Sequence, residues 1–246
     1  MIGLALWIFA LAPSVHRWLA PVSLLRLQAQ VQGVVCILEA GDRLEIVGDT
    51  VEFRPRADTL EVRLRHRVQS WLARWGWALD TLVIRVPREV PVALDLRQQG
   101  GLLVLQAQDL RFEKIQGHLS RVRALVNLQG AERVARVRLQ AGWSRLQIQP
   151  EPLHPPEYLE IQIQWSRLTL DLRHPPAHET PVVLAAQFSW IQFQTNGAPV
   201  AAVRQGLLNL GPLPQDPRNP GYRILLSGNF NRISVVSGTT AKEVHP

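Results

Sequence analysis

Short apolar runs recur along residues 82–149, and short polar stretches that contain glycine separate them. Within these runs apolar and polar residues alternate. Val92, Leu94 and Leu96 would face one side of a strand, and Ala93 and Asp95 the other. An alternation of period two predicts a half-buried β-strand rather than a helix.

The runs also repeat at a longer interval. Two sets of aliphatic residues recur roughly every 21 to 22 residues, at the lower end of the range typical of solenoid repeats. The sets are Leu94, Ile115 and Val137, and Leu103, Leu125 and Leu146. A two-strand coil cannot bury its own apolar face, whereas stacked coils bury one another. We therefore predict a β-solenoid. A meander or a sandwich would explain the alternation but not the repeat.

The same alternation continues on both sides of this stretch. Residues 31–38 and 43–47 predict two strands joined by a hairpin-like turn at Ala40, Gly41 and Asp42. Residues 201–210 fit a short helix or another strand. Residues 222–236 predict the last coil.

The first 27 residues are mostly apolar and form a separate segment. The first apolar run ends at Val15, before His16 and Arg17, and is shorter than the roughly 20 residues of a spanning helix. A signal peptide, a membrane anchor over residues 1–25 and a short amphipathic helix packed on the domain all remain open. The expected organisation is a segment of residues 1–27, a solenoid domain of residues 28–238 and a polar tail of residues 239–246.

Composition limits the classes of partner. The net charge is +7, and nearly all basic residues are arginine. Many of these arginines occupy alternate strand positions, as Arg121 and Arg123 do, which predicts a solvated sheet face. Nucleic acid is therefore not the expected ligand, although such a face can attract an anionic envelope polymer by charge. Cys36 is the only cysteine, lies in an apolar strand and is expected in the core.

No catalytic constellation is found. Solenoid enzymes that cleave polysaccharides use carboxylates from neighbouring coils. Steps of one repeat from Asp95 reach Gln116, Arg138 and Gln162, and Asp171 aligns with Gln147, so no column of acids is expected.

Metal and cofactor sites are not expected either. His174 and His178 have helical ligand spacing, but Pro175 and Pro176 forbid the helix, and His154 also precedes two prolines. The sequence predicts no enzyme, no metal and no cofactor.

Three tryptophans, Trp71, Trp75 and Trp77, gather in residues 68–79, where the strand rhythm breaks. They are the candidate contact residues for a ligand or partner, as an aromatic platform for glycans or lipid headgroups. The alternative is that they plug an open end or side of the solenoid, because large aromatic side chains mostly serve packing.

The run Leu82-Val83-Ile84-Arg85-Val86-Pro87, the strand at residues 92–96, and Gly101 before Leu103-Val104-Leu105 resemble the "putative adhesin" or toastrack domains of bacterial envelope proteins. LiaF-like cell-wall stress proteins carry such a domain at their C-terminus. The resemblance implies an all-β, single-layer, right-handed β-solenoid in the cell envelope that binds or senses without catalysis.

The expected function is that of a non-enzymatic bacterial envelope protein, membrane-anchored or exported, with a cytoplasmic location as the alternative. Its solenoid would serve scaffolding, adhesion or regulation of an envelope stress partner. A carbohydrate-binding or carbohydrate-active solenoid that uses Trp71, Trp75 and Trp77 is the alternative function.

Overall fold

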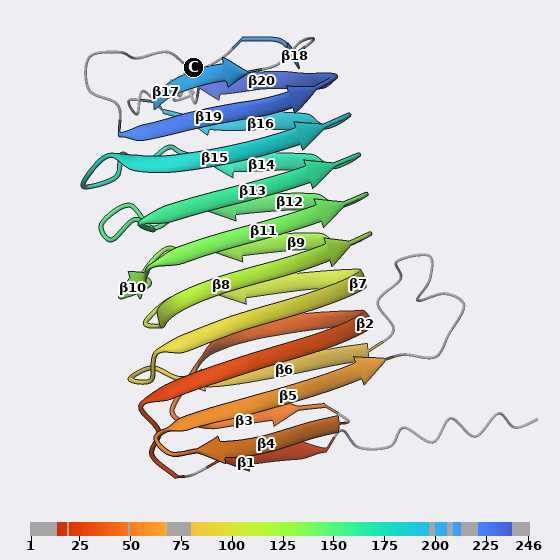
Figure 1. Ribbon diagram of the computed structural model, residues 1–246, viewed down its shortest axis with the longest axis vertical. Helices are drawn as coiled ribbons and strands as arrows, with labels where there is room; N and C mark the ends of the chain where they lie inside the picture. The colour runs from red at the N-terminus through yellow and green to blue at the C-terminus, as the bar shows by residue number, and fades with distance from the viewer. Residues whose placement is uncertain are drawn as a thin grey trace, which may run out of the picture.

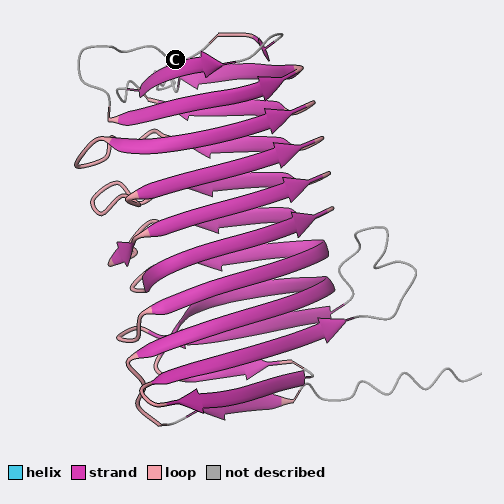
Figure 2. Cartoon of the chain, in the orientation of Figure 1, coloured by secondary structure: helices cyan, strands magenta, loops and turns pink. Residues whose placement is uncertain are grey.

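The computed structural model describes residues 14–18, 20–48, 50–67, 80–196, 200–205, 209–212 and 221–237. Every regular element in these ranges is a β-strand (Figure 2). The predictions for residues 1–13, the tryptophan-rich residues 68–79 and the tail at 239–246 lie outside the described residues.

The strands follow one another closely along the chain. They are β1 (Val15–Trp18), β2 (Leu24–Gly41), β3 (Leu44–Val47), β4 (Thr50–Arg56), β5 (Thr59–Arg67), β6 (Asp80–Pro87), β7 (Val92–Gln106), β8 (Arg111–Ser120), β9 (Arg123–Asn127), β10 (Arg133–Val134), β11 (Arg136–Gly142), β12 (Arg145–Gln149), β13 (Tyr158–Gln164), β14 (Arg167–Asp171), β15 (Thr180–Gln187), β16 (Trp190–Thr195), β17 (Val200–Gln205), β18 (Asn209–Leu210), β19 (Tyr222–Asn229) and β20 (Asn231–Ser237).

The chain winds into a flattened β-solenoid with two sheet faces, as Figure 1 shows. The first face, toward the viewer, has the order β4-β5-β2-β7-β8-β11-β13-β15-β19-β17. The second has the order β1-β3-β6-β2-β7-β9-β12-β14-β16-β20-β18. The long strands β2 and β7 belong to both faces. The predicted all-β solenoid is confirmed.

The order of the coils in the stack differs from their order in the chain at both ends. The coil of β2 lies between β5–β6 and β7, and the coil of β19–β20 lies between β15–β16 and β17–β18. Pairing between coils is parallel, whereas β4 on β5, β3 on β6 and β1 on β3 are antiparallel. The predicted hairpin of residues 31–38 with 43–47 is wrong, because β3 pairs with β1 and β6 instead.

The predicted inner column of Leu94, Ile115 and Val137 is confirmed. These residues are buried and are direct partners in successive strands. The column continues through Leu159, Val182 and Ile224.

The second predicted column contains one error. Leu103 and Leu146 flank Ala124, whereas Leu125 pairs with Val104 on the outer side. The prediction for Leu125 is wrong by one position, since Ala124 takes its place in the column. A slip of one residue moves a side chain to the opposite face of a strand.

The N-terminal boundary also differs from the prediction. Residues 15–18 form β1 and residues 24–27 begin β2, so these parts of the expected N-terminal segment are strands of the solenoid. The solenoid therefore begins before residue 28.

Residues 201–205 and 209–210, for which the sequence left helix or strand open, are strand. No helix with the length and apolar character needed to cross a membrane occurs in the described ranges.

The corner between the two faces limits which residues the early coils can use. Gly101 has a φ of +86°, and a Cβ there would overlap the carbonyl group of Val34 in the neighbouring coil. Gly142, at the same corner two coils further along the stack, has no positive φ, and a Cβ added there would have no atom within 4 Å. Glycine is therefore required at position 101, whereas position 142 can accept a larger residue.

We expect Gly101→Ala to destabilise the protein by more than about 1 kcal/mol, since alanine is strained at positive φ and would collide with Val34. Gly142→Ala, the control, should be neutral or slightly stabilising. Urea unfolding followed by circular dichroism measures both. Equal stabilities of the two variants would contradict this account of the corner.

Candidate functional site

One corner of the solenoid repeats the same backbone geometry coil after coil. In each of seven coils, the residue that forms this corner has a left-handed φ between 49° and 71°. The corner residues are Gly33, Gly100, Arg121, Trp143, Trp165, Phe188 and Phe230. Large residues rarely adopt this conformation. The first two of these coils use glycine and the next uses Arg121, whereas the later four place an aromatic ring at the corner.

The four aromatic rings form a continuous stack along the solenoid. Ring centroids are 5.4 Å apart for Trp143 and Trp165, 4.3 Å for Trp165 and Phe188, and 5.0 Å for Phe188 and Phe230. The interplanar angles are 8°, 6° and 1°. The side chains are nevertheless 66%, 45%, 42% and 53% exposed. We call these four residues the aromatic ladder.

A buried polar ladder lies next to the aromatic ladder and fixes the corner. The backbone N–H of Ser144 donates to Oγ of Ser166 at 3.0 Å, that of Ser166 to Oγ of Ser189 at 3.2 Å, and that of Ser189 to Oδ1 of Asn231 at 3.1 Å. The N–H of Val122 donates to Oγ of Ser144 in the same way, at 3.1 Å. Each side chain thus satisfies a backbone donor that the turn removes from the sheet.

The next position of each coil faces outward and is mostly arginine. Arg123, Arg145 and Arg167 are direct partners in successive strands, followed by Trp190 and Arg232. The guanidinium carbons of Arg167 and Arg232 lie 4.4 and 5.1 Å from the ring centroid of Trp190, so this ring lies against two cations. We call these five residues the arginine row.

The arginine row has no acidic partner for its charge. None of its arginines forms an ion pair with a described carboxylate, and besides the ring of Trp190 Arg167 contacts the amide oxygen of Gln192, at 3.4 Å. Strands in a sheet lie about 4.8 Å apart, and like charges directly opposite one another destabilise it. The row can therefore gain free energy by binding anions.

The aromatic ladder and the arginine row together form the corner strip. A shallow groove of about 740 Å³ runs between them in the coils of Arg123, Arg145 and Arg167. This strip is not among the predicted sites, although the sequence carries a signal for it. Trp143-Ser144-Arg145 recurs as Trp165-Ser166-Arg167, one repeat later.

The predicted contact residues Trp71, Trp75 and Trp77 lie outside the described residues. The residues on either side of this segment, Arg67 and Asp80, lie at the same corner as the aromatic ladder. Arg67 pairs with Gln32 and Asp80 with Val34, and these partners flank the corner residue Gly33.

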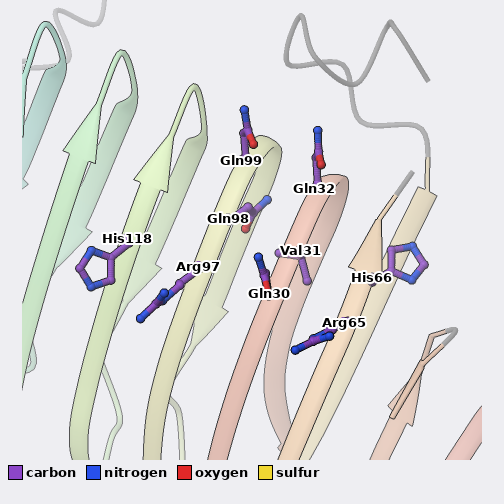
Figure 3. A pocket seen from close by; sticks show the side chains of 9 residues that line it. All are labelled: Gln30, Val31, Gln32, Arg65, His66, Arg97, Gln98, Gln99 and His118. Carbon is purple, nitrogen blue, oxygen red and sulfur yellow. The ribbon is translucent and has the colours of Figure 1, made fainter. Parts of the chain in front are cut away.

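A second hollow of about 460 Å³ lies on the first face near this corner, as Figure 3 shows. Arg65, Arg97 and His118 line it together with Gln30. The buried Gln98 also lines it, but its amide donates to the carbonyls of three residues at 3.2 Å and so braces the turn. These groups can attract an anion. Among the described residues, none of these groups is paired with a nucleophile.

The acid positions differ from their predicted columns. The column of Asp95, Gln116 and Arg138 continues to Glu160 rather than Gln162. Arg138 donates to Glu160 at 2.7 Å, and this hydrogen bond lowers the pKa of the Glu160 carboxyl.

Asp171 aligns with Gln149 rather than Gln147, and Gln149 donates to it at 3.3 Å. Burial raises the pKa of Asp171, but hydrogen bonds from Arg173 outweigh this effect and lower it overall. Glu160 and Asp171 are thus ionised partners of arginine rather than proton donors. No group of three metal-binding side chains occurs within the described ranges.

Comparison with known proteins finds no matching family model and no matching curated protein. The solved structures that resemble the chain include the following two. A "putative cell adhesion protein" from Clostridium sporogenes has 8% identity and a TM-score of 0.36, over 92% of this chain and 100% of its own. A "putative adhesin" from Bacteroides fragilis has 11% identity and a TM-score of 0.41, over 91% and 96%.

Both names belong to the class of domain that the sequence resembles. At such low identity and TM-score, however, the likeness says nothing about ligand or activity. The functional argument therefore depends on the corner strip itself.

We expect Ser166→Ala to destabilise the protein by about 1–3 kcal/mol, because the buried N–H of Ser144 loses its acceptor. Ser120→Ala is the control, since Ser120 is exposed beside the same corner, and it should change stability by less than about 0.5 kcal/mol. Chemical unfolding measures both. A neutral Ser166→Ala would show that the polar ladder is not needed for stability.

Proposed function

We propose that this protein is a non-enzymatic binding protein of the bacterial cell envelope that presents the corner strip to an anionic partner. The observation that carries this proposal is the arginine row. Arg123, Arg145 and Arg167 stand in register without a described carboxylate partner. An external anion is the group that relieves their mutual repulsion.

The solenoid suits a binding role because it holds its outer side chains at fixed intervals. Parallel backbone pairing joins each coil to the next, from β5 at one end to β17 at the other. A linear, regularly spaced surface of this kind fits adhesion, scaffolding or the regulation of an envelope partner. The ion-paired states of Glu160 and Asp171 support a role without catalysis.

An envelope location is part of the proposal, and it depends on the apolar residues at the start of the chain. Residues 1–13 are almost entirely apolar, and β1 follows at Val15. A membrane anchor or an export signal in this segment would bring the solenoid to the envelope. The carbohydrate-binding alternative through Trp71, Trp75 and Trp77 stays a prediction, since no described residue favours it.

Polyanion binding tests the role of the arginine row. We expect a triple variant with Arg123→Gln, Arg145→Gln and Arg167→Gln to elute from immobilised heparin at clearly lower salt than the wild type. Its control carries Arg26→Gln, Arg136→Gln and Arg223→Gln, which removes the same charge from exposed positions of the first face. Equal elution of the two variants would refute a specific role for the row, because net charge alone would then explain retention.

Cell fractionation tests the envelope location. Removal of residues 1–13 leaves every described strand in place, and we expect it to shift the protein from the membrane fraction to the soluble fraction. A full-length protein that already fractionates with the cytosol would contradict the proposed location.

A further inference from the structure

The two inner rings of the aromatic ladder, Trp165 and Phe188, do not offer free faces. Its rings are nearly parallel and 4.3–5.4 Å apart, so each inner ring is covered on both faces by its neighbours. Proteins that bind single-stranded nucleic acid by stacking present open faces to successive bases. Sugar rings in aromatic platforms need open faces as well. The ladder instead exposes ring edges, which form one apolar line.

The position of this line is also specific. The ladder lies on the turns that join the two faces, at the ends of β11, β13, β15 and β19, and these turns form a projecting edge of the solenoid (Figure 1). The arginine row runs along one side of it. The other side carries Gly142, Gln164, Gln187 and Asn229, which are uncharged. No acidic side chain adjoins the line in these two columns.

An apolar edge flanked by cations matches the interface of an anionic bilayer. Tryptophan is enriched at the level of the lipid headgroups, where its ring is partly in apolar surroundings. Arginine and lysine at such a surface are attracted by anionic lipid. The ring edges can enter the interface while the rings stay stacked. A ligand that stacks between the rings would instead require them to separate. A convex edge also meets a flat surface more readily than it grips a thin polymer.

We propose that the corner strip binds the surface of an anionic lipid bilayer, with the solenoid axis parallel to the membrane. The aromatic ladder would enter the headgroup region, and the arginine row would contact lipid phosphates. This inference rests on the proposed function and names the anionic partner as a lipid surface. It is separate from any anchoring by residues 1–13.

Vesicle sedimentation with the full-length chain tests the proposal. Vesicles of phosphatidylcholine alone are compared with vesicles that also contain phosphatidylglycerol. We expect the Arg123→Gln, Arg145→Gln, Arg167→Gln variant to bind the anionic vesicles at least about tenfold more weakly than the wild type. The control with Arg26→Gln, Arg136→Gln and Arg223→Gln should bind them more tightly than the strip variant.

The aromatic ladder is tested separately. Trp143→Ser with Trp165→Ser should weaken binding to anionic vesicles, whereas Leu153→Ser, which alters an exposed apolar residue in a distant loop, should not. Trp143→Phe with Trp165→Phe keeps the apolar edge. It should therefore retain binding but lose part of the fluorescence quenching by lipids brominated near the headgroup. Circular dichroism confirms that each variant is folded.

The outcomes separate this inference from the proposed function. The strip variants are the triple arginine variant and the Trp143→Ser, Trp165→Ser variant. Weaker vesicle binding by both of them, with a partial loss of quenching in the phenylalanine variant, supports the inference. Vesicle binding equal to that of the wild type in the strip variants overturns it, because residues 1–13 would then account for the attachment. Retention on heparin that depends on the arginine row, without vesicle binding that depends on it, overturns the lipid inference alone. If neither heparin retention nor vesicle binding depends on the arginine row, both proposals are overturned.

Discussion

The in-register pairing of successive parallel coils is the constraint on which this structure depends. Each inner side chain stacks on its equivalent in the next coil, as Leu94 does on Ile115 and Ile115 on Val137. Backbone hydrogen bonds between coils fix the spacing at about 4.8 Å. Because a coil cannot bury its apolar face alone, the stack is the smallest unit that can be stable.

The same register determines the chemistry of the surface. A position in one coil has its equivalents directly above and below it, so a repeated sequence produces rows of like side chains. At the corner this yields the aromatic ladder, the buried ladder of Ser144, Ser166 and Ser189, and the arginine row. Aromatic rings and hydroxyls gain from this repetition through stacking and hydrogen bonds. Arginines repel one another, and only Trp190 interrupts their row.

The ends of the stack are organised differently from its middle. The coils of β2 and of β19–β20 are inserted one place inward, so that β5–β6 and β17–β18 lie outside them. At the N-terminal end the antiparallel strand β4 then forms the edge of the first face. It carries Glu52, Arg54 and Pro55, and charge and proline at an edge strand discourage pairing with another chain.

The sequence determined most of the strands, the inner column of Leu94, Ile115 and Val137, and the solenoid class, because alternation and repeat length can be read directly along the chain. It did not determine the register to one residue, so Leu125, Gln162 and Gln147 were assigned to wrong columns. The pairing of β3 and the insertion of coils at both ends were also decided by tertiary structure, since chain order does not specify which coils stack. The corner strip depends on that stacking: its residues are separated by whole repeats and meet only when the left-handed corner places them in one row.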